Sequence, residues 1–140
     1  MKNIKKEISI DDIRQKMLAH PRTPCHIFLK TTVCGQAIFH GAGLVDIPHG
    51  PPLDPDHRDR FRTHAVMMIR DGIGQHRPVE QVMMVAGLLI GTLPGVENDI
   101  TGCMLTVDVR DGEIAVSHRF VPVDEVQKQA QQHGVWKTHH

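Results

Sequence analysis

Histidine, aspartate and arginine side chains are concentrated in the stretch VDIPHGPPLDPDHRDRFRTHA, residues 45–65 of a chain of 140. Imidazoles can bind metals, transfer protons or gain charge near neutral pH, and aspartate carboxylates can complete a metal site. Guanidinium groups favour phosphates and carboxylates. The stretch is therefore the first candidate for a functional site, unless it is only a stiff connector that leads into a helix.

Part of this stretch has a structural explanation that needs no chemistry. Asp54 is a favourable N-cap, Pro55 suits the first turn of a helix, and Gly72 is a favourable stop. Near the N-terminus, Ser9 followed by Asp12 forms a capping-box pattern for another helix. The predicted helices span residues 10–20, 55–71, 78–91 and 123–133.

Two β-hairpins are expected between these helices. Alternating apolar residues flank Asp111-Gly112, a pair that is typical of a type I′ turn, and Gly35 permits a tight turn after Cys34. The predicted hairpins cover about residues 25–46 and 102–121.

The element order is then α-β-β-α-α-β-β-α, which predicts an α+β fold. Hairpins and helices of this kind bury their apolar faces most simply in two layers, a mostly antiparallel sheet packed against helices. The length suits a single domain over residues 1–140, with a frayed tail at 135–140.

The predicted registers bring histidines to apolar faces. In the second hairpin His118 pairs with Leu105, and in the first hairpin His40 pairs with Leu29. On the helix over 55–71, Phe61, Ala65 and Met68 form the expected buried stripe. His57 and His64 share that face, because they lie four residues before and three residues after Phe61.

Two interpretations of these histidines stay open. Each could be a buried neutral imidazole that is hydrogen-bonded to a backbone carbonyl. Alternatively, they could line a pocket that holds a ligand, with Arg58 and Arg62 as a cationic edge for an anion. The residues predicted to bind a ligand are His40, His49, His57, Arg58, Arg62, His64 and His118.

A divalent metal is the cofactor that this composition suggests, and a metal-dependent hydrolase or lyase is the corresponding alternative function. The spacing of the histidines argues against a shared metal ion. His57 and His64 are separated by roughly 10.5 Å along a helix axis, and no metalloprotease-type motif is present. The candidate metal ligands are His40, Asp46, His49, His57, His64 and His118.

The composition argues against some classes of binding partner. Lysine plus arginine (16) equals aspartate plus glutamate (16), and only four phenylalanines and one tryptophan are present, which argues against nucleic acid. The longest apolar run, residues 82–90, is shorter than a membrane span, and the N-terminus lacks a secretory signal pattern. Three cysteines without a paired spacing suggest reduced thiols. We therefore expect a cytoplasmic protein.

The helix over 78–91 is apolar nearly all round, which predicts that a second copy of the chain covers one side of it. Together these patterns predict a small non-enzymatic binding protein, acting as a homo-oligomer. It would capture a small polar or anionic ligand, or a protein partner, through segment 46–64. A purely structural or assembly role is the remaining alternative.

Overall fold

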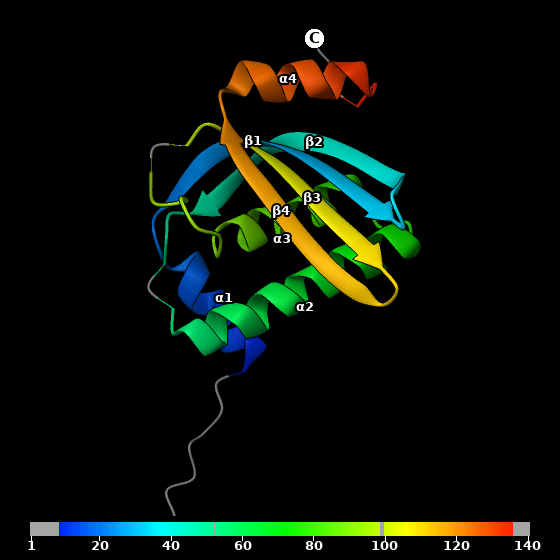
Figure 1. The fold of residues 1–140 in the computed structure, drawn as a ribbon. Helices are drawn as coiled ribbons and strands as arrows, with labels where there is room; N and C mark the ends of the chain where they lie inside the picture. The colour runs from blue at the N-terminus through cyan, green and yellow to red at the C-terminus, as the bar shows by residue number, and fades with distance from the viewer. Residues whose placement is uncertain (1–8, 52, 99, 136–140) are drawn as a thin grey trace, which may run out of the picture.

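A mixed sheet of four strands in the order β2-β1-β3-β4 forms the centre of the structure (Figure 1). The computed structural model describes residues 9–51, 53–98 and 100–135. Each hairpin is antiparallel, and the two hairpins join through parallel pairing of β1 with β3. The strands are β1 (Arg22–Val33), β2 (Gln36–Pro48), β3 (Gly102–Arg110) and β4 (Glu113–Val121).

The predicted α+β class, the element order and the mostly antiparallel sheet are confirmed. The helices are α1 (Ile10–Leu18), α2 (Pro55–Gly74), α3 (Val79–Ile90) and α4 (Val123–Gln132). The frayed tail predicted for 135–140 lies, from residue 136 onward, outside the described residues.

Both hairpins close through tight turns whose central residues adopt positive φ. Cys34 and Gly35 have φ of 51° and 84°, and Asp111 and Gly112 have φ of 48° and 83°. Two left-handed residues in succession are the mark of the type I′ turn, which matches the twist of the flanking strands. The turn predicted at Asp111-Gly112 is therefore confirmed.

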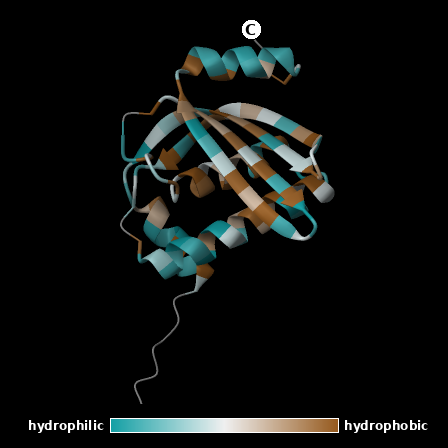
Figure 2. Cartoon of the chain, in the orientation of Figure 1, coloured by the Kyte–Doolittle hydropathy of each residue, from teal (hydrophilic) through white to brown (hydrophobic). Residues whose placement is uncertain are grey.

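The helices cover both faces of the sheet. Helices α1, α2 and α3 lie on the face that carries Ile27, Leu29 and Leu105, which are all buried. Helix α4 lies on the opposite face, where a separate small cluster forms around Phe28 and Val126 (Figure 1). Figure 2 shows α4 as largely hydrophilic and α3 as largely hydrophobic. The structure thus adds a third layer to the expected two.

The helix ends follow the capping signals in most places. The Ser9 hydroxyl accepts a hydrogen bond from the Asp12 amide at 3.0 Å, and the Asp54 carboxylate accepts one from the Asp56 amide at 2.9 Å. The predicted stop at Gly72 is wrong, because α2 continues to Gly74. Gly72 is buried instead, and a Cβ at this position would lie 3.3 Å from Val82 Cγ2 of α3.

A pair of glycine substitutions tests the close packing of α3 on the sheet. A Cβ at Gly87 would lie 2.6 Å from Val45 Cγ1, whereas a Cβ at Gly74 would meet nothing within 4 Å. Gly87→Ala should therefore lower the free energy of unfolding by about 1–3 kcal/mol through overpacking. Gly74→Ala should raise it by up to about 1 kcal/mol through reduced chain entropy. Equal effects in urea denaturation would contradict the close approach.

Candidate functional site

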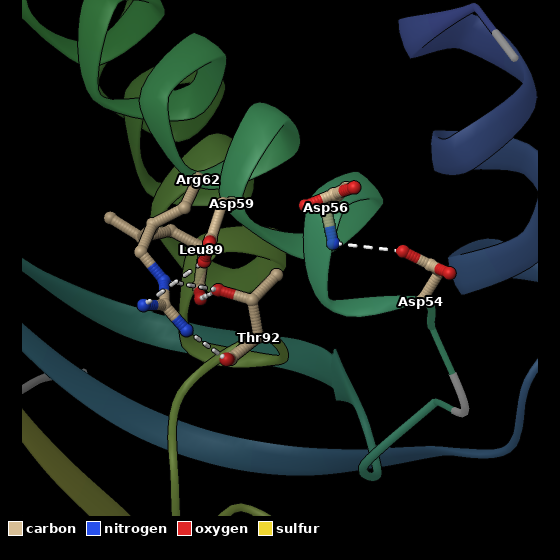
Figure 3. Close-up of polar contacts among 6 residues, drawn as sticks. All are labelled: Asp54, Asp56, Asp59, Arg62, Leu89 and Thr92. Carbon is tan, nitrogen blue, oxygen red and sulfur yellow. Dashed lines mark hydrogen bonds and ion pairs between the residues drawn. The ribbon is translucent and has the colours of Figure 1, made fainter. Parts of the chain in front are cut away.

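Three of the basic side chains predicted to bind a ligand hold the loop that follows α3. His49 Nε2 donates to the Glu97 carbonyl at 2.7 Å, and His118 Nε2 donates to the Pro94 carbonyl at 2.9 Å. Arg62 Nη2 donates to the Thr92 carbonyl at 2.5 Å (Figure 3). Because a carbonyl can only accept, both imidazoles must carry their proton on Nε2.

The remaining polar groups of His49 and Arg62 are also engaged by the protein. Thr23 Oγ1 lies 3.3 Å from His49 Nδ1, which is the free acceptor of that tautomer. Arg62 Nε donates to Thr92 Oγ1 at 3.3 Å, and Asp59 lies 4.0 Å from its guanidinium (Figure 3). For His49 and His118, the interpretation as imidazoles bonded to backbone carbonyls therefore fits the geometry.

The other candidates on α2 lie toward solvent. His64 is exposed, and His57 and Arg58 are partly buried. The predicted stripe is therefore wrong for His64 and for Met68, which is 41% exposed. The helix turns its other flank to the core, so that the buried residues are Phe61, Ala65, Val66, Ile69 and Gly72.

The predicted pairing of His40 with Leu29 is also wrong. A register shift opposite Thr31 and Thr32 leaves Ile38 unpaired, so Leu29 pairs with Gly41 and His40 pairs with Lys30. One extra residue in a strand turns every following side chain to the other face. The bulge therefore moves His40 from the α3 face to the face that carries α4.

The same registers define a polar row across the α4 face of the sheet. Lys30 pairs with His40 on one side and with Thr106 on the other, and Thr106 pairs with Ser117. The row thus contains one residue from each of the four strands. Arg119 belongs to the neighbouring row, where it pairs with Met104.

A hollow of about 360 Å³ lies over this part of the sheet, beside α4. Two of its lining residues, Lys30 and Arg119, are cations, and no aspartate or glutamate lines it among the described residues. The hollow is lined, among others, by Phe28, Lys30, Met104, Thr106, Ser117, Arg119, Gln129 and His133. Cations, hydroxyls and an amide beside an apolar wall can bind an anion that has an apolar part.

Three aromatic rings pack together at the edge of this hollow. The His40 and His133 ring centroids are 4.3 Å apart, and the Phe28 ring lies 5.2 Å from that of His133. His40 Nε2 is buried and has no hydrogen-bond partner in the described part of the chain. Burial, followed by the nearby charges of His133 and Lys30, lowers the pKa of His40. This environment therefore disfavours the charged form of His40.

The candidate metal ligands do not come together. His40 lies in the polar row, whereas His118 pairs with Leu105 on the opposite face, so these imidazoles cannot share an ion. Within residues 9–51, 53–98 and 100–135, no three histidine, cysteine, aspartate or glutamate side chains are grouped to hold a metal.

The cysteines offer no activated thiol in the sheet. Burial raises the pKa of Cys25 to about 11 and that of Cys103 to about 12. Cys34 is exposed at the first hairpin turn.

No protein-family model matches the chain, and neither a curated protein nor a solved structure shows significant similarity to it. No described helix is both long enough and apolar enough to cross a membrane. The function must therefore be inferred from the geometry of the chain.

Sequence patterns alone identified only part of the polar row and the hollow. The alternation of the second hairpin places Thr106, Ser117 and Arg119 on its polar face. Lys30 could have been placed on the equivalent face of the first hairpin by the same alternation, since it follows the apolar Leu29. His133 and Gln129 reach the site only because α4 crosses that face.

Arg62 should stabilise the loop after α3. Arg62→Met keeps much of the apolar stem but leaves the buried Thr92 without its charged donor, so the free energy of unfolding should fall by about 1–3 kcal/mol. Arg58→Met is the matched control, because Arg58 makes no side-chain hydrogen bond within the described residues. Chemical denaturation measures both, and an equal loss would contradict the anchoring role.

The lowered pKa of His40 predicts a pH-dependent stability. The unfolded chain should take up a proton at this side chain near the ordinary pKa of 6.5, while the folded chain resists it. The contribution of His40 to stability should therefore be full above pH 6.5 and fall as the pH decreases from there. His40→Phe preserves a stacking ring and should weaken this fall, whereas His64→Gln should not. Urea denaturation across this pH range tests the difference, and identical slopes for wild type and His40→Phe would contradict it.

Proposed function

We propose that this protein is a small non-enzymatic binding protein that captures a small organic anion in the hollow between its sheet and α4. The observation that carries the proposal is the placement of Lys30 and Arg119 on one hollow without a lining carboxylate. Neither side chain forms an ion pair within the described residues. An anion would supply the missing countercharge.

The position of Lys30 in the sheet favours anion binding. Lys30 is partly buried in the interior strand β1, between His40 and Thr106 in the polar row. A charge that is partly shielded from water interacts more strongly with a bound anion than a fully exposed charge does. Arg119 on β4 contributes a planar guanidinium, which can donate two hydrogen bonds to a carboxylate or phosphate.

The rest of the lining gives the ligand a shape as well as a charge. Phe28 and Met104 form an apolar wall, and Thr106 and Ser117 supply hydroxyl groups. The volume of about 360 Å³ falls in the range of small-molecule sites. We therefore propose a carboxylate or phosphate ester with an apolar or planar part that packs against Phe28.

The proposal keeps the anionic ligand class expected from the sequence but moves the site away from segment 46–64. His49 and Arg62 in that segment are engaged in supporting the loop after α3. The hydrolase or lyase alternative has no support of this kind, because His40 and His118 lie on opposite faces of the sheet.

Binding can be tested with a panel of small anions. Phosphate, citrate, benzoate, indole acetate and adenosine monophosphate would be screened by thermal shift, and each hit would be measured by titration calorimetry. At least one organic anion should raise the melting temperature. Lys30→Gln and Arg119→Gln should each weaken its binding by about tenfold or more, the usual loss for one charge-assisted hydrogen bond.

Arg70→Gln is the matched control, since it removes the same charge from α2 on the other side of the sheet. The Arg70→Gln variant should bind the anion with the same affinity as the wild type. Absence of stabilisation by every anion, or an equal loss in Arg70→Gln, would contradict the proposed site.

A further inference from the structure

Strand β2 leaves one side of its backbone unpaired. It stands at the end of the sheet order β2-β1-β3-β4, and no other strand of the described chain pairs with its outer side. At 13 residues it is the longest strand in the sheet. Exposed edges of this length template further strand pairing where charges, bulges or a covering segment do not protect them, and the bulge of β2 lies only at Ile38, near its start. Here Leu44, which is 59% exposed, lies in the middle of the edge.

An apolar groove of about 590 Å³ runs beside this edge, between α1 and α3. Its exposed apolar side chains include Leu18, Val79 and Met84, which are 37%, 45% and 64% exposed. Groove and edge together form one apolar surface that the described chain leaves uncovered, and surfaces of this kind mark interaction sites.

Two opposite charges on this surface, Glu80 and Arg22, lie near the two ends of β2. The other charged residues that line the groove are Arg14, which is ion-paired with Asp11, and Asp46. A Cβ at Gly41 would lie 3.3 Å from Met83 Sδ, and a Cβ at Gly87 would lie 2.6 Å from Val45 Cγ1, so α3 runs alongside β2 in the same direction. Glu80 therefore lies toward the start of β2. Arg22 lies at the opposite end, because it pairs with Pro48. Both residues line the groove.

We infer that the occupant of this surface is a second copy of the chain. Antiparallel pairing of two β2 strands about a twofold axis near Gly43 reverses one copy against the other. Glu80 of each copy then approaches Arg22 of the other copy, so these two opposite charges face each other across the interface. The same axis, perpendicular to the sheet, places the two α3 helices side by side and covers Met84. The product is a continuous eight-stranded sheet.

The mass of the intact protein in solution tests the inference. Sedimentation equilibrium should give twice the mass of one chain, with dissociation on dilution. Met84→Lys adds a charge to a side chain that is already 64% exposed, so folding should be unaffected. It should raise the dimer dissociation constant by at least about tenfold, because the charge would be buried in the interface and would compete with Arg22 of the other copy for Glu80. Met67→Lys, which changes a 39% exposed methionine of α2, should leave the mass unchanged.

Exchanging the charges of Glu80 and Arg22 by mutation distinguishes a second copy of the chain from other occupants of this surface. Glu80→Arg and Arg22→Glu should each raise the dissociation constant several-fold, and the double variant should recover most of the loss, since the opposite charges again face each other. A wild-type protein that is monomeric at every soluble concentration would overturn the inference and leave a different protein or an apolar ligand as the occupant. A dimer that tolerates Met84→Lys would overturn it equally.

Discussion

The extra residue in β2 decides which side chains each face of the sheet presents. Without the bulge at Ile38, a two-residue turn at Cys34-Gly35 would pair Leu29 with His40 and place that imidazole on the α3 face. With the bulge, Gly41 pairs with Leu29 instead. A Cβ at Gly41 would collide with the Phe39 ring and crowd Met83 of α3. The bulge therefore allows α3 to approach the sheet and places His40 beside Lys30 on the other face.

Support for the loop after α3 is the second constraint on the fold. This segment crosses from the end of α3 to the start of β3 without a helix or strand to pair its carbonyls, so side chains supply the donors. His49, Arg62 and His118 supply them from three different elements or their ends. Basic side chains that resemble a binding site in the sequence thus satisfy backbone groups. On the α4 face, by contrast, Lys30 and Arg119 form no ion pair within the described residues.

The local features of this fold could be predicted from the sequence, and the non-local features could not. The caps at Ser9 and Asp54 and the turn at Asp111-Gly112 act through neighbouring residues, so their signals are contained in short stretches. Gly41 and Gly43 in the sequence suggest a bulge or a close approach in this strand, but they do not place the bulge at Ile38, which depends on how Gly41 and Phe39 fit against α3. The crossing of α4 onto the face around Phe28 depends on a small cluster of residues distant in the sequence. Errors at these points moved His40 to the wrong face and left Lys30 and His133 outside the predicted site.

Strand β2 connects the two surfaces that this structure offers for binding. Its alternate residues face opposite sides of the sheet, so His40 borders the hollow beside α4 while Gly41 and Val45 face α3. Its outer edge is free in the described chain, whereas its inner edge is fixed to β1 along nearly its whole length. Close contacts with Gly87 and Gly91 hold α3 against β2, and Val82 packs on α2, so the remaining flank of that apolar helix, which carries Met84, faces outward. The exposed groove is therefore a consequence of the same register that builds the polar row.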